Sequence, residues 1–145
     1  MSCELCTGDG GELVWRDTRC RVVLVDEPDY PGYCRAVWNA HVAEMTDLTA
    51  GERSHLMRVV CEVEDALRKC LHPDKINLAS LGNAVPHLHW HVIPRFREDP
   101  HFPNSIWGAR KRRPAPRSAD LIAVKRQLAA RLAALAASRV DTSKT

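Results

Sequence analysis

Residues His87–Arg95 read HLHWHVIPR. Histidine occupies every second position at its start, and the residues between and after are Leu88, Trp90 and Val92. This alternation, in a run rich in aromatic and β-branched residues, predicts a β-strand. Because successive side chains of a strand point to opposite faces, we expect all three imidazoles on one face, roughly 7 Å from each to the next. The apolar side chains are expected on the other face.

Three imidazoles in a row, at His87, His89 and His91, suit a core poorly because every ring needs polar partners. Metal binding is one chemical use of such a row. Phosphoryl or acyl transfer is the other, since a neutral imidazole is a good nucleophile and its neighbours can orient it or donate protons. A strand is also a stiff platform for a reacting group. The pattern favours catalysis over a pure metal site and over structural histidines.

The surrounding sequence predicts short strands around one long helix. Strands are expected at residues 12–15, 19–26, 33–39 and 75–81, in addition to 87–95. The capping box Thr49-Ala50-Gly51-Glu52 begins a helix that His72-Pro73 ends, and residues 118–138 form a final helix. This order of elements predicts an α+β fold with an antiparallel sheet.

Length and composition favour one globular domain. The chain has 145 residues, of which 45% are apolar and 27% charged, and no apolar run approaches the ~20 residues of a membrane span. Because the N-terminus lacks a basic region followed by an apolar stretch, we expect a cytoplasmic protein whose six cysteines are mostly free thiols.

Charge is distributed unevenly. Residues 1–109 carry 11 basic and 16 acidic side chains, whereas residues 110–145 carry 10 basic and 2 acidic ones. We therefore expect a histidine-bearing domain at 1–109 and a basic C-terminal segment with a helix at 110–145. The basic run Arg110–Arg113 has no interleaved aromatic residues, so it predicts no specific nucleic-acid partner.

The segment Asn83–Arg95 resembles the signature of the histidine triad (HIT) family, His-x-His-x-His followed by apolar residues. The resemblance covers about residues 3–97. Downstream of these, further short stretches resemble a bacterial branch of the family. The supporting stretches are Val22–Asp26, Tyr30-Pro31-Gly32, Val37–His41, Asp47-Leu48, His101-Phe102-Pro103 and Ile106-Trp107. The family fold is a twisted antiparallel sheet of about five strands with a long helix against it, which agrees with the predicted order of elements.

The resemblance implies a nucleotide hydrolase or nucleotidyl transferase that works through a covalent nucleotidyl-histidine intermediate. In this chain His89 would attack the α-phosphorus, His91 would hydrogen-bond a phosphate oxygen, and His87 would orient His89 from behind. Dinucleoside polyphosphates and nucleoside phosphoramidates are both candidate substrates, and the chemistry requires no cofactor. Two other classes stay open: a nucleotide-binding sensor with incidental turnover, and a metal-storage or redox protein.

The same resemblance implies three substrate-binding residues, and the place of Trp107 in the proline-rich region suggests a fourth. Asp26 matches the position of a carboxylate on the ribose hydroxyls, although an aspartate that starts a turn is the alternative. Asn77 and Asn83 match polar positions near the phosphates, although an asparagine that only forms a turn is the alternative at Asn83. Trp107 would cover a base or contact a dimer partner. The run Asn83–Pro86 departs from the family pattern, since many members have Gln followed by Ser or Thr there. Pro86 has no backbone N–H, so this point of the chain has one donor fewer for a phosphate.

A structural zinc site is also implied. Cys3-Glu4-Leu5-Cys6 brings two thiolates to adjacent corners of a tetrahedron, and family members complete such a set with two histidines, here His41 and His87. This closed set has no open position for chemistry. The alternative is a frayed N-terminus, with His41 only capping a strand.

The resemblance finally implies a homodimer. Trp38, Met57 and Val60 offer more apolar surface than one small sheet needs, and the proline-rich run before Trp107 is expected to lie across the neighbouring subunit. The alternative is that residues 98–117 fold back onto their own chain.

Overall fold

The computed structural model describes residues 2–141 and contains one antiparallel sheet of five strands, in the order β1-β2-β3-β5-β4. The strands are β1 (Glu12–Arg16), β2 (Cys20–Leu24), β3 (Cys34–Trp38), β4 (Lys75–Ala79) and β5 (His89–Arg95). The helices are α1 (Glu4–Thr7), the 3-10 turn η1 (Met45–Asp47), α2 (Ala50–Leu71) and α3 (Leu121–Asp141). The predicted α+β class and antiparallel sheet are confirmed.

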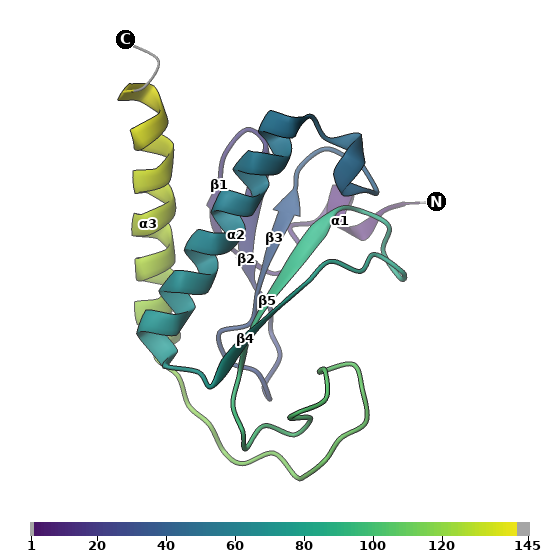
Figure 1. The fold of residues 1–145 in the computed structure, drawn as a ribbon, viewed down its shortest axis with the longest axis vertical. Coiled ribbons are helices and arrows are strands. Elements are labelled where there is room, and N and C mark those ends of the chain that lie inside the picture. Colours follow the sequence, from purple (N-terminus) through teal and green to yellow (C-terminus); the bar gives the residue numbers. More distant parts are fainter. Residues whose placement is uncertain (1, 142–145) are drawn as a thin grey trace.

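The long helix α2 begins and ends where its sequence signals predict. The Thr49 side chain accepts from the Glu52 N–H while the Glu52 carboxylate accepts from the Thr49 N–H, so both members of the capping box are in place. At the other end His72 adopts a left-handed conformation (φ 49°), and Pro73 follows it. The helices α2 and α3 cover one face of the sheet and lie side by side (Figure 1).

The main core fills the space between the sheet and these helices. Trp38 is 4% exposed and Val60 is fully buried, both inside this core. The expectation that they leave surplus apolar surface for a dimer is therefore wrong, because α2 and α3 cover this face of the sheet within one chain.

The last helix starts three residues later than expected. Asp120 accepts a hydrogen bond from the Ala123 N–H, so its side chain caps the first turn and α3 begins at Leu121. Val124, Leu128 and Leu132 of α3 are buried in the same core as α2. The C-terminal segment thus contributes to the core of the sheet, and residues 142–145 of that segment lie outside the described residues.

The opposite face of the sheet carries the polar residues of interest. Core-facing positions of β2 alternate with Arg21 and Val23, and those of β3 alternate with Arg35 and Val37. In register with these, Arg35 lies opposite His91 and Val37 lies opposite His89. None of the helices within residues 2–141 has the length and apolar character needed to cross a membrane.

Candidate active site

His89 and His91 project together from the face of the sheet opposite to α2 and α3, which is called the open face below. Both are on β5, their ring centroids are 4.8 Å apart, and the rings meet nearly edge to face. This distance between ring centroids is shorter than the expected spacing of roughly 7 Å. They are 8% and 5% exposed, so this pair is largely removed from water.

The His87 side chain contacts different groups from those of His89 and His91. His87 precedes β5, with its N–H bonded to the Val85 carbonyl in a tight turn, and its imidazole is fully buried. The ring donates from Nε2 to the Trp38 carbonyl oxygen (2.6 Å). What reaches His89 is the backbone of His87: its carbonyl oxygen lies 2.5 Å from His89 Nδ1.

This contact fixes the proton of His89. A carbonyl oxygen only accepts, so Nδ1 carries the hydrogen and the lone pair of the neutral ring lies on Nε2. Burial is the largest influence on this group and lowers the pKa of His89 below its usual 6.5. His89 is therefore a neutral imidazole at neutral pH with an available nitrogen, as a nucleophile must be.

His91 is held by Tyr33, whose hydroxyl lies 2.5 Å from His91 Nδ1. Burial raises the pKa of Tyr33, so the hydroxyl keeps its proton and is able to donate a hydrogen bond to Nδ1. Burial, with smaller effects from His89 and Arg35, lowers the pKa of His91 to about 4. His91 is consequently neutral, and the tautomer in which Tyr33 donates to Nδ1 has the proton of the imidazole on Nε2.

The depressed pKa of His91 gives a testable dependence of stability on pH. The unfolded histidine titrates near 6.5, about the usual value, whereas the folded one titrates near 4. As pH falls through this window the unfolded chain takes up a proton that the folded chain refuses, so the free energy of unfolding decreases. The variant His91→Asn is expected to lose less stability between pH 6.5 and 4 in urea titrations, and equal losses in both proteins would contradict this.

The side chains of Cys3, Cys6, His41 and His87 form a compact set of possible metal-donor atoms. Sγ of Cys3 and Sγ of Cys6 lie 3.3 and 3.5 Å from His87 Nδ1, and His41 Nδ1 lies 3.3 Å from the same atom. Cys6 Sγ is also 3.4 Å from His41 Nδ1. A tetrahedral zinc with its usual bond lengths has donor–donor edges of about 3.3–3.8 Å, so the set fits that ion. The His87 bond to the Trp38 carbonyl oxygen gives the ring the outer partner that metal-bound histidines usually have.

The N-terminal segment packs against the sheet, so the alternative of a frayed N-terminus is wrong. Leu5 is 5% exposed, and the buried guanidinium of Arg21 donates to the carbonyl oxygens of Leu5, Gly8 and Asp9. The helical turn α1 places both cysteines toward His87.

Trp107 lies against the triad of its own chain. Its ring centroid is 4.9 Å from that of His91, and the indole is half exposed. It borders a hollow of about 450 Å³ with Ser105 and the edge strand β4. The structure thus shows the fold-back arrangement of residues 98–117, and the wall beside His91 comes from the same chain.

The other three expected substrate residues are Asn77, Asp26 and Asn83. Asn77, on β4, accepts from Arg95 through its amide oxygen (2.7 Å). Asp26 and Asn83 are exposed, and Asp26 borders a hollow between β2 and Leu121 of α3. The structure thus brings Trp107 to the triad, and it shows no contact between these three side chains and His89 or His91.

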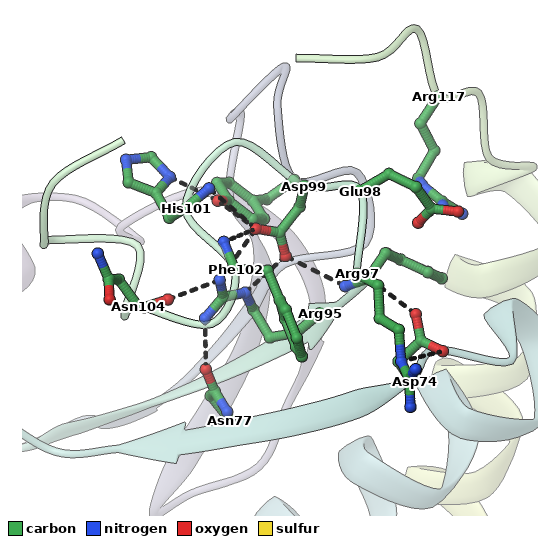
Figure 2. A network of polar contacts seen from close by, with 12 residues as sticks. Asp74, Asn77, Arg95, Arg97, Glu98, Asp99, His101, Phe102, Asn104 and Arg117 are labelled. Atoms are coloured by element: carbon green, nitrogen blue, oxygen red, sulfur yellow. Dashed lines mark hydrogen bonds and ion pairs between the residues drawn. The ribbon is translucent and has the colours of Figure 1, made fainter. Parts of the chain in front are cut away.

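Sequence reasoning missed three features of the site. The sequence pattern places Tyr33 only in a strand and gives Arg35 no role, although the position of Arg35 opposite His91 follows once the strand register is known. The third is the pair Arg95–Asp99, which anchors the loop after β5 (Figure 2). The spacing of four residues between opposite charges, directly after the strand, was a signal for that pair.

The geometry agrees with what comparison of the chain with known proteins shows. Residues 10–98 match the model of the HIT domain, so the chain belongs to the HIT family. The residues matched include all five strands, α2, and the three histidines.

Solved structures show the same fold over nearly the whole chain. A histidine triad protein from Marinobacter aquaeolei is 26% identical with a TM-score of 0.72, and covers 93% of this chain and 97% of its own. A zinc-bound histidine triad family protein from Mycobacterium smegmatis is 25% identical with a TM-score of 0.61, and covers 95% of this chain and 98% of its own.

Two curated relatives carry named activities. The asymmetrical bis(5'-nucleosyl)-tetraphosphatase of Schizosaccharomyces pombe is 28% identical over 95 residues, which are 61% of this chain and 52% of that protein. The AP-4-A phosphorylase of Mycobacterium tuberculosis is 29% identical over 106 residues, 69% of this chain and 54% of that protein. The chain thus spans about half the length of these two relatives. Membership of the family and these relatives support an activity on nucleotides.

Proposed function

We propose that the protein is a nucleotide hydrolase or nucleotidyl transferase that acts through a covalent nucleotidyl-histidine intermediate on His89. The observation that carries this proposal is the bond from His89 Nδ1 to the His87 carbonyl oxygen, which leaves Nε2 unprotonated on the open face. Nε2 attacks the α-phosphorus, and the bond from phosphorus to the leaving group breaks on the opposite side. Water or another acceptor then breaks the phosphorus–nitrogen bond and restores His89.

His91 and Trp107 complete the chemistry and the wall of the site in this proposal. The Nε2–H of His91 donates to a phosphate oxygen, where negative charge develops during attack. Because Tyr33 holds the other nitrogen, this donor is already oriented before substrate arrives. The half-exposed indole of Trp107 stacks on a nucleobase.

The polar residues expected around the substrate keep proposed roles. The amide oxygen of Asn77 is used by Arg95, so its NH₂ group is the donor left for a phosphate oxygen. Asn83 offers an exposed amide ahead of the triad, and Asp26 offers an exposed carboxylate to the two ribose hydroxyls. The cytoplasmic location expected from the sequence stays a prediction.

We propose that Cys3, Cys6, His41 and His87 hold a structural zinc ion. The distances among their donor atoms and the zinc-bound relative support this assignment. Zinc in a closed set of two thiolates and two imidazoles supplies cross-linking of the chain, here of α1 to the end of β3 and the start of β5. The transfer chemistry proceeds at His89 and needs no metal.

The test of the function is hydrolysis of a substrate panel by the purified protein. Dinucleoside polyphosphates and nucleoside phosphoramidates are incubated separately, and release of nucleoside monophosphate is followed by chromatography. Turnover of either class supports the proposal and identifies the leaving group. Saturable calorimetric binding of AMP without any product would replace it with the alternative of a nucleotide sensor.

A homodimer is the expected assembly. Among the described residues β4 pairs only with β5, so its outer edge leaves backbone groups available to a second sheet. Leu78 on this strand and Leu81 just beyond it are 38% and 53% exposed. Light scattering at low concentration is expected to give twice the chain mass, and a mass near 16.3 kDa would contradict a dimer.

A further inference from the structure

The loop that follows β5 is organised by one buried ion pair. Arg95, the last residue of β5, is 2% exposed, and Asp99 is 7% exposed. The guanidinium donates to both carboxylate oxygens, from Nε at 2.8 Å and from Nη2 at 2.9 Å. A two-pronged contact of this kind is strong and fixes the orientation of both groups.

The Asp99 carboxylate also accepts hydrogen bonds from the start of the loop. It accepts from the backbone N–H groups of Phe96, His101 and Phe102 and from the Tyr30 hydroxyl. Burial alone would raise the pKa of Asp99, but Arg95 and the backbone donors lower it to about 2. The carboxylate is therefore ionised at any physiological pH.

Arg95 connects the Asp99 carboxylate to the segment that carries Trp107. Its Nη1 donates to Asn77 on β4, and its Nη2 donates to the Asn104 carbonyl oxygen at 2.7 Å (Figure 2). Beyond Asn104 the chain closes into a tight turn, because the Asn104 side chain donates to the Ala109 carbonyl oxygen and the Gly108 N–H donates to that of Ser105. Trp107 lies inside this turn and faces His91.

The contacts of Arg95 exclude a direct role in binding phosphate. Nε, Nη1 and Nη2 all have protein acceptors, and the side chain is almost without access to water. An arginine that binds substrate needs donors directed into the site, and those of Arg95 are directed into the loop. Its influence on a substrate must pass through the residues it holds.

We propose that Arg95 and Asp99 are positioning residues that set the place of Trp107 beside His91 and so determine how strongly the site binds the nucleobase of its substrate. This inference rests on the proposed function, because it assigns a nucleotide to the site. Loss of the ion pair releases the turn at Asn104, and the indole loses its fixed position. The triad keeps its geometry, since His89 and His91 are held by the His87 carbonyl oxygen and by Tyr33.

The experiment compares two probes that differ only in the base: AMP and ribose 5-phosphate, with binding measured by calorimetry. Trp107→Ala is expected to weaken AMP binding by about 10-fold or more, the effect of one lost stacking contact, and to leave ribose 5-phosphate nearly unchanged. Asp99→Asn is expected to give the same selective loss. In the double variant the second change adds nothing for AMP, because both act through the same indole.

Arg97→Ala is the matched control. Arg97 lies in the same loop, but its ion pair with Asp74 is exposed, with 81% of the Arg97 side chain open to solvent (Figure 2). Exposed pairs contribute little, so neither probe should bind differently in this variant. If Asp99→Asn does not fold, Arg95→Lys takes its place, since lysine keeps the charge beside Asp99 but cannot reach Asn77 and Asn104 at once.

Three results would overturn the inference: equal weakening of both probes, a full additional loss in the double variant, or AMP affinity that Asp99→Asn leaves intact. Failure of the proposed function gives a different result. In that case the wild-type protein binds AMP with the expected dependence on Asp99 and Trp107 yet releases no monophosphate from any compound of the substrate panel.

Discussion

Replacing His89 with alanine is expected to lower kcat by about 10⁴-fold or more on whichever substrate class the wild-type protein turns over. The proposed reaction has no other route, because the phosphorus–nitrogen bond forms at His89 Nε2, and loss of an enzyme nucleophile has effects of this size. AMP affinity should change much less, since Trp107 and His91 stay in place. Steady-state kinetics and calorimetry on the same preparation measure both quantities.

The matched control is His72→Asn. His72 is exposed, lies at the far end of α2, and adopts a left-handed conformation that asparagine tolerates. This variant removes one imidazole without touching the open face of the sheet, so its kcat should equal that of wild type. Equal activity of wild type and His89→Ala, with both proteins folded, would remove His89 from the mechanism.

Removing zinc is expected to lower the melting temperature by about 10 °C. A structural zinc site contributes folding free energy directly, and for a chain of this size each kcal/mol shifts the melting temperature by about 3 °C. The effect should fall short of complete unfolding because the main core between the sheet and the helices forms without the N-terminal segment. Differential scanning calorimetry with and without a chelator measures it.

Well below the new transition, kcat should stay close to that of the zinc-loaded protein. The carbonyl that orients His89 belongs to a backbone held on both sides of Leu88, by bonds to Val42 and Trp38 that involve no metal. Cys6→Ser should lower the melting temperature and abolish its response to chelator. Cys61→Ser, which changes an exposed thiol on α2, should do neither. Metal analysis that finds no zinc on the wild-type protein would end the assignment.

Local patterns in the sequence predicted the elements well and the contacts between them less well. The capping box at Thr49 is a local signal, and the long helix begins where it predicts. The position of Arg35 opposite His91 depends instead on the order β3-β5 in the sheet, and no local pattern specifies that pairing.

The same limit applies to His87. Strict alternation predicts a common face for the three imidazoles, but it does not predict which groups each residue contacts. The His87 N–H bonds to the Val85 carbonyl in a tight turn just before β5, and the His87 ring reaches the cysteines while its carbonyl lies beside His89. Two roles expected of one side chain are therefore divided between the side chain and the backbone of His87.

In the proposed reaction His89 itself carries the nucleotide, and mass spectrometry of the quenched enzyme detects that adduct. The protein is mixed with a turned-over substrate, denatured within the first turnover under alkaline conditions that preserve phosphorus–nitrogen bonds, and digested. We predict one nucleotidyl group on the peptide that contains residues 87–95, assigned by fragmentation to His89 and absent from His89→Ala. A nucleotidyl group on another residue, or rapid turnover with no adduct in quench-flow samples that span the first turnover, would contradict the claim.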